Sequence, residues 1–444
     1  MRLLELGQLR VGVLGFGREG RAAASILTEA RPDIDLTVLI ESGAPPDGYA
    51  ARVGSFDDHL LDYDVLIRSP GVPVLHPAVQ RFQAAGGRVV NPASIWFAER
   101  PGLPVIGVTG SKGKSTTASM LAHLLRLAGR GVLLAGNIGV PLLAHLNTEA
   151  DVVVLELSSY QLADLDGRLS LGLMTRLFPE HGDWHGGVEH YYASKRRMIG
   201  LLKGAPLLVN ARDEVLLAQT ADAPNRVLGN RAPLVHRRGE ALYRGSEYLL
   251  DLDQLDLLGR HNLDNAALAL EAAVQQAIPL GSAVAGLRSF HPLAHRLEPV
   301  VDRAGLRWIN DSIATTPHAT LAALEAMSGE PVVLIAGGYV RPADWAPVVE
   351  HCRRHRLRGL VLLPDSGQAV ASAFENAGVM PLQPPGLVEN LSEAVTESAR
   401  LAGDKATILL SPGAASFPHF QDFEHRGRCF RLAVEAYYND RSTA

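Results

Sequence analysis

The sequence predicts an α/β protein with parallel sheets, divided into three domains. Short runs of valine, isoleucine and leucine alternate with alanine- and leucine-rich helical segments along almost the whole chain. This alternation is typical of repeated strand, helix, strand units. Two proline-flanked breaks, PGLP at 101–104 and FHPLAHRLEP at 290–299, interrupt it. We therefore expect domains at 1–98, 99–297 and 298–444.

Apolar runs of strand length identify the candidate strands. They are 11–15, 36–40, 65–67, 105–108, 152–156, 207–209, 332–336, 360–363 and 407–410. Helical periodicity is clearest at 118–127 and at 262–276. Each helix is expected to connect neighbouring parallel strands.

Composition restricts the class of protein. The chain of 444 residues is 47% hydrophobic and 20% charged, which allows large cores, and its net charge of −5 gives no general reason to expect a nucleic-acid partner. Its two cysteines, Cys352 and Cys429, cannot form a disulfide framework. The sequence has neither a signal-peptide pattern at its start nor an apolar run long enough to cross a bilayer. We expect a soluble cytoplasmic protein without a membrane partner.

The segment GVTGSKGKSTT at 107–117 predicts a nucleotide phosphate-binding loop between a strand and a helix. It is one residue longer than the strict pattern, because Val108 stands where the first glycine is expected and the glycine is Gly107. Small residues allow backbone N–H groups to approach phosphate, Lys114 can neutralise it, and the hydroxyl of Ser115 or Thr116 can reach Mg²⁺. The alternative is a glycine-rich turn with an incidental lysine.

Two later segments carry further polar candidates. DVVVLELSSYQL at 151–162 places Glu156 at the end of an apolar strand, where a carboxylate suits Mg²⁺ bound to nucleotide phosphates. The alternative is a solvent-exposed acid. The next segment contains four potential metal ligands, His181, Asp183, His185 and His190. Their spacing matches no structural zinc template, so we expect one ligand or substrate contact from this loop.

The first domain carries a dinucleotide-binding pattern. GFGREG at 15–20 matches G-x-G-x-x-G between a strand and a helix, and Glu41 ends the next strand. SPGV at 69–72 adds a second tight turn after another strand. An NAD-dependent oxidoreductase is one interpretation. A UDP-sugar satisfies the same backbone geometry, and the domain has room for about half of a full dinucleotide fold.

Taken in order, the motifs resemble those of the Mur ligase superfamily, ATP-dependent amide-forming enzymes of peptidoglycan precursor synthesis. The matching segments, which span essentially the whole chain, are GVTGSKGKSTT, ELSSYQL, EHGDWH, the lysine of YYASK, GRHNLDNAALAL, AHRLE, NDSIATTP and LSPGAASFPHFQDFEHRG. The last motif is similar to that of the branch that adds glutamate to UDP-N-acetylmuramoyl-L-alanine.

The resemblance implies an N-terminal Rossmann-like UDP-binding domain, a central P-loop ATPase-like domain and a C-terminal Rossmann-like domain that binds the amino acid. It also implies a cytoplasmic, monomeric ligase that acts on small molecules through an acyl phosphate, in a pathway of cell-wall synthesis, cell shape and division. The nearest rivals are a folylpolyglutamate-type ligase, the oxidoreductase and a non-catalytic nucleotide-binding scaffold.

The resemblance assigns roles to individual residues. Lys114, Glu156, His181 and Lys195 would be catalytic, with Ser115 and Glu156 holding one Mg²⁺, His181 a second, and Lys195 carbamylated. The ATP phosphates would contact Gly110, Ser111, Lys112, Gly113, Lys114, Ser115 and Thr116, and the adenosine side Asn262, Asn265, Arg296 and Asp311. The UDP pocket would contain Gly15, Phe16, Gly17, Glu41, Ser69 and Gly71. Asn137 and Ser159 would lie near the muramoyl-peptide or phosphate end.

The acceptor motifs depart from the family pattern at two positions. Ile313 in DSIATT and Arg341 in GGYVR stand where the family has lysines. Arginine keeps the charge but replaces a point donor with a planar fork. Thr315, Ser416 and Phe423 remain as candidate acceptor contacts. We expect an acidic amino acid that is held differently, with L-glutamate favoured and D-glutamate as the alternative.

Overall fold

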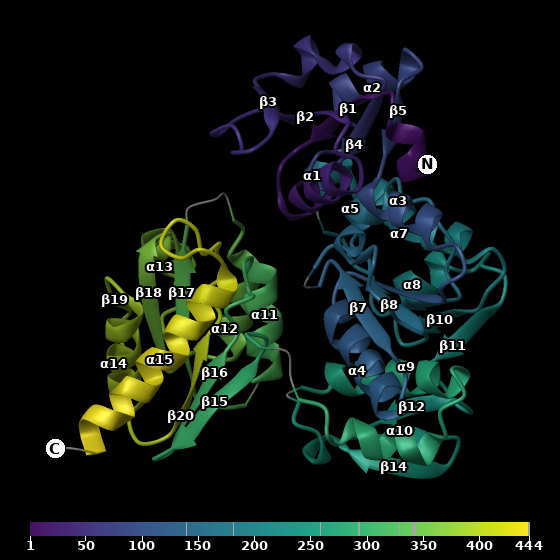
Figure 1. The fold of residues 1–444 in the computed structure, drawn as a ribbon. Coiled ribbons are helices and arrows are strands. Elements are labelled where there is room, and N and C mark those ends of the chain that lie inside the picture. Colours follow the sequence, from purple (N-terminus) through teal and green to yellow (C-terminus); the bar gives the residue numbers. More distant parts are fainter. Residues whose placement is uncertain are drawn as a thin grey trace. The chain divides into compact units, whose positions relative to one another are not determined.

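The computed structural model describes residues 1–138, 140–180, 182–257, 259–291, 294–327, 329–339 and 343–442. The chain divides into two compact units. The first comprises Met1–Leu255 and His261–Phe290, and the second Asp256–Arg260 and His291–Ala444. The expected α/β class with parallel sheets is confirmed (Figure 1). The three predicted domain boundaries stay a prediction; the one near residue 98 falls inside helix α3 (Pro92–Glu99).

The first unit begins with a five-stranded parallel sheet in the order β3-β2-β1-β4-β5. Its strands are β1 (Arg10–Leu14), β2 (Asp35–Ile40), β3 (Ala50–Val53), β4 (Val65–Arg68) and β5 (Arg88–Val90), and its other helices are α1 (Arg18–Ala30) and α2 (Pro77–Ala84). Leu14 of β1 pairs with Arg68 of β4. This register brings the turns after both strands to one edge of the sheet.

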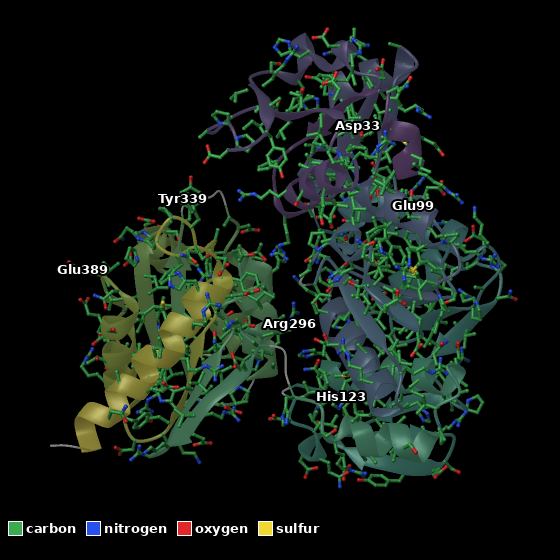
Figure 2. All side chains as sticks on the ribbon, in the orientation of Figure 1. Asp33, Glu99, His123, Arg296, Tyr339 and Glu389 are labelled. Carbon is green, nitrogen blue, oxygen red and sulfur yellow. The ribbon has the colours of Figure 1, made fainter. Side chains whose placement is uncertain are left out.

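Helix α3 follows this sheet in the chain. It ends at Glu99, which is labelled in Figure 2. The side chain of Glu99 accepts a hydrogen bond from the backbone N–H of Leu3 at 2.7 Å. Short 3-10 helices occur at η1 (Leu3–Leu6), η2 (Phe56–Asp58), η3 (Leu60–Asp62), η4 (Leu142–His145) and η5 (Leu252–Gln254).

The second sheet of this unit has six parallel strands in the order β11-β10-β9-β6-β8-β7. They are β6 (Val105–Thr109), β7 (Val132–Gly136), β8 (Val152–Glu156), β9 (Leu171–Met174), β10 (Leu207–Asn210) and β11 (Arg226–Gly229). The helices are α4 (Lys114–Leu127), α5 (Ser159–Leu162), α6 (Gly182–His185), α7 (Val188–Leu202), α8 (Glu214–Gln219), α9 (His261–Gln275) and α10 (Leu280–Leu287). Strand β6 lies between β8 and β9, so its end is surrounded by other strand ends.

A small antiparallel sheet, absent from the sequence-based prediction, completes the first unit. It contains β12 (Val235–Arg238), β13 (Ala241–Arg244) and β14 (Glu247–Asp251). Charged and apolar residues are mixed in these short strands, and Gly239 and Gly245 form the turns with positive φ. Each strand has only two adjacent buried residues, so no continuous apolar run marks them.

The second unit has a six-stranded sheet in the order β15-β16-β20-β17-β18-β19. Its strands are β15 (Glu298–Arg303), β16 (Leu306–Asn310), β17 (Val332–Gly338), β18 (Gly359–Asp365), β19 (Gly386–Leu387) and β20 (Ala406–Leu410). Only the β15–β16 pair of this sheet is antiparallel. One face packs against α11 (Pro317–Ala326), α12 (Ala346–Arg354) and α13 (Gly367–Asn376), and the other against α14 (Leu391–Ala402) and α15 (Phe423–Ser442).

All nine predicted strands are strands in the structure, and the predicted helical segments 118–127 and 262–276 correspond to α4 and to α9, which ends at Gln275. The first of these, α4, begins four residues earlier than predicted, because the phosphate-loop motif itself enters the helix at Lys114. Within the described part of the chain, no helix has both the length and the apolar character that crossing a bilayer requires.

Candidate active site

The predicted phosphate loop connects the buried strand β6 to helix α4. Gly110 has φ +151° and Gly113 has φ +87°. A β-carbon would lie 2.1 Å from Thr175 Oγ1 at the first position and 2.3 Å from Asn265 Oδ1 at the second. Both backbone conformation and space therefore require glycine here, and the chain enters the N-terminus of α4 where helix N–H groups favour an anion.

The loop is held by its own polar groups, by residues that follow the neighbouring strand β9, and by Tyr191 of α7. Ser111 N donates to Arg176 O at 2.5 Å, and Ser111 Oγ lies 2.7 Å from Tyr191 Oη. Thr175 Oγ1 donates to Lys112 O at 2.6 Å. Lys114 Nζ donates to Ser111 O at 2.8 Å, so this lysine lies back over the loop. Ser115 and Thr116 are buried in the first turn of α4.

Lys195 reaches the same loop from α7. Its side chain is 2% exposed, and Nζ donates to Gly110 O at 2.7 Å. Nζ also lies 5.0 Å from the centre of the Tyr191 ring. Burial, reinforced by the charge of Lys114, lowers the pKa of Lys195 well below its usual value, although Glu180 and Glu156 oppose this shift. The neutral amine is thus more accessible at Lys195 than at a surface lysine.

Glu156 ends β8, directly beside β6, and pairs in register with Val108. Its side chain is fully buried, and Oε1 accepts a hydrogen bond from Asn137 Nδ2 at 2.9 Å. Within the described residues, Oε2 has no hydrogen-bond partner. An unsatisfied buried carboxylate oxygen is unfavourable unless a cation or donor joins it. The site therefore fits Mg²⁺, which prefers oxygen ligands.

The histidine-rich segment contains the next group of predicted polar residues. His181 and the side chain of Asp183 lie outside the described residues. His185 is buried and forms hydrogen bonds with Ser159 Oγ at 2.9 Å and Ser194 Oγ at 3.3 Å. His190 contacts Gly186 O at 3.3 Å. In the parts of the chain that the structure describes, no three His, Cys, Asp or Glu residues form a metal cluster. His185 instead orients Ser159.

Two of the predicted adenosine-side residues lie on α9. Asn265 Nδ2 donates to Asn262 Oδ1 at 3.0 Å, and both side chains are buried. The contact between Asn265 and Gly113 places this pair beside the phosphate loop. The other two belong to the second unit, where Asp311 accepts from Ser411 Oγ at 2.8 Å and from Leu297 N, next to Arg296, at 3.2 Å.

The predicted UDP-site residues gather at one edge of the first sheet. Gly15 has φ +79°, and Ser69 Oγ donates to Gly15 O at 2.8 Å, which ties the two glycine-containing turns together. Phe16 packs edge-to-face on Tyr49, with ring centres 5.6 Å apart. Glu41 is exposed, 3.6 Å from His76 Nε2. Gly17 and Gly71 are exposed in the same turns.

The second unit contains a cavity of about 370 Å³. Its lining residues are Gly338, Leu363, Pro364, Glu389, Asn390, Leu391, Ser392, Ser416, His419, Phe420, Arg426 and Cys429. Of the predicted acceptor residues, Ser416 lines this cavity. Phe423 begins α15, Thr315 is exposed just before α11, and Arg341 lies outside the described residues.

Arg426 is the cavity residue that sequence reasoning missed. It is 1% exposed and donates to Ser312 Oγ at 3.0 Å, Ser312 O at 2.8 Å and Ala414 O at 3.0 Å. Its guanidinium has no ion-pair partner in the described parts of the chain. Burial lowers its pKa to about 10, while Asp311 acts in the opposite direction. Arg426 is therefore a buried cation at neutral pH.

A glycine-containing loop at a helix N-terminus, beside a buried carboxylate on the next strand, defines an α/β protein that binds nucleotide phosphates. Two family models match the chain: the Mur ligase middle domain at 108–273, and the Mur ligase, glutamate ligase domain at 295–413.

Curated relatives match over nearly the full length. A UDP-N-acetylmuramoyl-L-alanine--L-glutamate ligase of Micromonospora sp. is 38% identical, covering 98% of both chains. Ligases of the same name from Salinispora tropica and Xylella fastidiosa are each 36% identical, covering 98% and 97% of this chain and 99% and 96% of theirs. The chain belongs to the Mur ligase family, as the sequence motifs predicted.

Solved structures agree on the fold. UDP-N-acetylmuramate-alanine ligase MurC from Thermotoga maritima matches with a TM-score of 0.60 and 18% identity, covering 98% of this chain and 100% of that one. MurF from Acinetobacter baumannii also has a TM-score of 0.60 and 18% identity, covering 90% and 85%. At this identity the match supports the architecture alone.

Proposed function

We propose that the protein joins L-glutamate to UDP-N-acetylmuramoyl-L-alanine with conversion of ATP to ADP and phosphate, a step of peptidoglycan precursor synthesis. The full-length relatives with this printed name support the substrates. The observation that carries the chemistry is the register of β6 and β8, because it puts the phosphate loop and the buried Glu156 at the same edge of one sheet. The NAD-dependent alternative gives no role to Lys114, Glu156 or Lys195.

The reaction has two steps. An oxygen of the alanyl carboxylate attacks the γ-phosphorus of ATP, ADP leaves, and an acyl phosphate forms. The glutamate amine then attacks the acyl carbon, phosphate leaves with the bonding electrons, and the amine loses a proton as the amide forms. Lys114 and the N–H groups of the loop hold the phosphates and offset their negative charge, which is the main catalytic contribution in phosphoryl transfer.

The metal-binding residues are proposed as a set of oxygen and nitrogen donors. Ser115, Glu156, His181 and a carbamylated Lys195 would hold two Mg²⁺ ions. When bound, Mg²⁺ supplies further neutralisation of the phosphate oxygens. The lowered pKa of Lys195 supports carbamylation, because only the neutral amine attacks CO₂. The carbamate that forms is an anion, and the positive charge of Lys114 lies in the same site.

The remaining predicted residues are proposed to bind the rest of the substrates. The ATP phosphates would contact the loop from Gly110 to Thr116, and adenosine the side chains of Asn262, Asn265, Arg296 and Asp311. UDP would bind at Gly15, Phe16, Gly17, Glu41, Ser69 and Gly71, with Asn137 and Ser159 nearer the muramoyl-peptide end. We further propose three domains at the predicted boundaries and a monomer that works in the cytoplasm.

We place the acceptor glutamate at the cavity that contains Ser416. Thr315, Arg341 and Phe423 complete the predicted set, and Arg426 adds a buried positive charge at the cavity wall. A carboxylate in the cavity would compensate this charge. Ile313 removes one cation relative to the family pattern, so a different set of cations would hold the amino acid. The printed names of the relatives favour L-glutamate over D-glutamate.

Phosphate release by the purified protein tests this proposal. With ATP, Mg²⁺ and UDP-N-acetylmuramoyl-L-alanine, we expect turnover with L-glutamate and little with D-glutamate. Turnover with D-glutamate alone would keep the ligase but contradict the acceptor choice. No turnover with either amino acid, in a preparation that binds the UDP substrate, would contradict the ligase reaction.

A further inference from the structure

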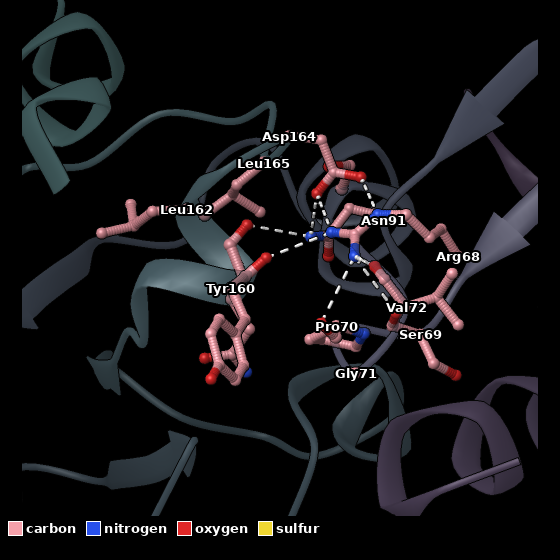
Figure 3. A network of polar contacts seen from close by, with 12 residues as sticks. Arg68, Ser69, Pro70, Gly71, Val72, Asn91, Tyr160, Leu162, Asp164 and Leu165 are labelled. Carbon is pink, nitrogen blue, oxygen red and sulfur yellow. Dashed lines mark hydrogen bonds and ion pairs between the residues drawn. The ribbon is translucent and has the colours of Figure 1, made fainter. Parts of the chain in front are cut away.

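A buried arginine connects the first sheet to helix α5 (Figure 3). Arg68 is the last residue of β4, and its side chain is 0% exposed. Its Nε and one terminal nitrogen donate to the two carboxylate oxygens of Asp164, each at 2.7 Å. This two-point pairing fixes the plane of the guanidinium as well as its position.

The same guanidinium holds the turn 69–72. Its other terminal nitrogen donates to Ser69 O at 3.2 Å, Pro70 O at 3.4 Å and Val72 O. The carbonyl between them, Gly71 O, accepts from Trp184 Nε1 at 3.1 Å. Every carbonyl of this turn therefore has a donor from Arg68 or Trp184.

This arrangement leaves one amide of the turn for a ligand. Ser69 N donates to Leu14 O, Val72 N donates to Ser69 O, and Pro70 has no N–H. Within the described residues, Gly71 N has no hydrogen-bond acceptor, and Gly71 is exposed. Because Arg68 and Trp184 already occupy the carbonyls, the polar group that the turn offers to a ligand is the free N–H of Gly71. This group can donate to an acceptor atom of the ligand.

The other end of the network lies on α5 and on Asp164, just beyond the end of this helix. The terminal nitrogen of Arg68 that pairs with Asp164 also donates to Tyr160 O at 3.1 Å. Asn91 Nδ2 donates to Gln161 O at 3.0 Å and to Asp164 Oδ1 at 2.8 Å. The Gln161 side chain in turn donates to Glu19 of α1 at 2.7 Å. Helix α5 is thus tied to α1 and to the 69–72 turn.

Helix α5 also begins with Ser159, which His185 holds at 2.9 Å. The ring of Tyr160 stacks on Trp184 with centres 4.3 Å apart, and the Trp184 ring contacts that of His185. Trp184, which donates to Gly71 O, and His185, which bonds to Ser159, therefore pack together. The two proposed ends of the UDP-linked substrate site, the 69–72 turn and Ser159, are therefore attached to the same short helix.

We propose that Arg68 is a positioning residue for the UDP-linked substrate. Paired with Asp164, it fixes the 69–72 turn on α5, orients the free N–H of Gly71, and sets the separation between the UDP pocket and Ser159. Trp184 holds the remaining carbonyl of the turn, Gly71 O. This inference rests on the proposed function, because it assumes that a UDP-linked substrate occupies the turn. Arg68 acts through the backbone of the turn and touches no substrate.

Direct binding to the full-length protein tests this role. Calorimetry with UDP and with UDP-N-acetylmuramoyl-L-alanine should compare the wild type, Arg68→Lys, Trp184→Phe and Arg10→Lys. Lysine keeps the charge of Arg68 but cannot make the two-point pair and hold three carbonyls, so we expect affinity for both ligands to fall about tenfold or more. Trp184→Phe keeps the stacked ring and removes one neutral hydrogen bond, so about a threefold loss is expected.

Arg10→Lys is the matched control. Arg10 makes a two-point pair with Asp64 in the same sheet, at 2.9 and 3.2 Å, but it is 54% exposed and contacts no predicted substrate residue. We expect wild-type affinity for both UDP ligands. ATP affinity should remain within about twofold in all three variants, because the phosphate loop does not contact this network.

The outcomes separate the two levels of the proposal. If Arg68→Lys and Trp184→Phe lower the melting temperature but bind UDP and the substrate like the wild type, the arginine is merely structural and the inference is overturned. If Arg68→Lys does not fold, Trp184→Phe decides between these results alone. If the wild type binds ATP but neither UDP ligand, the proposed function fails and the inference fails with it.

Discussion

The phosphate loop of the first unit and the cavity of the second unit are each in contact with a buried cationic residue from a distant helix, but the rest of each site is built differently. In the first, Lys195 comes from α7 and donates to Gly110 O, whereas the loop itself is formed by one contiguous motif. In the second, Arg426 comes from α15 and is held by Ser312 and Ala414, from two separate segments. A phosphate is bound mainly by the backbone of a turn, whereas an amino acid needs side chains from several places. A short motif can therefore encode only the first kind of site.

The two cations also differ in protonation. Burial lowers the pKa of Lys195 well below the usual lysine value, while that of Arg426 falls only to about 10, because an arginine starts much higher. The lysine can lose its proton and be modified by CO₂. The arginine stays charged and suits permanent recognition of an anion. The same physical cause, burial, thus supports two different roles.

The largest expected effect is at the loop. Lys114→Ala should lower the rate of phosphate release about 10³-fold, because a positive charge aimed at the transferring phosphoryl group is lost. Binding of the UDP substrate should stay near the wild-type level, since the proposed UDP pocket lies at the edge of the first sheet and does not include Lys114. Lys405→Ala, an exposed lysine of the second unit, is the control. Normal turnover in Lys114→Ala would contradict the assignment of the loop.

Lys195→Met is expected to lower turnover about 10²-fold or more, and bicarbonate should not restore it. In CO₂-free buffer the wild type should also show a pH effect on stability. Between the depressed folded-state pKa and the usual value of about 10.4, the unfolded state binds more protons, so the free energy of unfolding rises with pH.

The Lys195→Met variant should lack this rise of the free energy of unfolding with pH. Urea unfolding of both proteins at several pH values up to about 10 measures the difference. Parallel curves would show that Lys195 is not perturbed by burial, and bicarbonate-independent turnover of the wild type would argue against carbamylation.

A smaller and more selective effect is expected in the second unit. Arg426→Lys should raise KM for glutamate about tenfold, because lysine cannot keep the contacts to Ser312 and Ala414 while presenting a charge to the cavity. KM for ATP and for the UDP substrate should change by less than about twofold. Arg428→Lys, on the same helix but 55% exposed, is the control. Equal changes in all three KM values would indicate a general loss of folding instead of an acceptor effect.

Local pattern was sufficient for much of the molecule. The nine apolar strands, the glycine loop and the strand-end position of Glu156 could be predicted, because each depends on neighbouring residues: alternating apolar runs, glycines with positive φ, and one acid after a buried strand. Strands β12, β13 and β14 could not, because each has only two adjacent buried residues and no continuous apolar run. Histidines 181, 185 and 190 look alike in the sequence, yet His185 is committed to Ser159 and Ser194.

The sequence by itself thus determined the α/β class, the family and the phosphate-binding loop. Only the tertiary structure decided which charged groups are buried together. Arg68 and Asp164 are 96 residues apart in the chain, and Arg426 and Ser312 are 114 apart. Such pairs leave no periodic signal, since their free energy depends on desolvation and on geometry that exists only after the sheets and helices pack. Arg68 follows the predicted strand 65–67 directly, but neither its burial nor its partner could be predicted from the sequence.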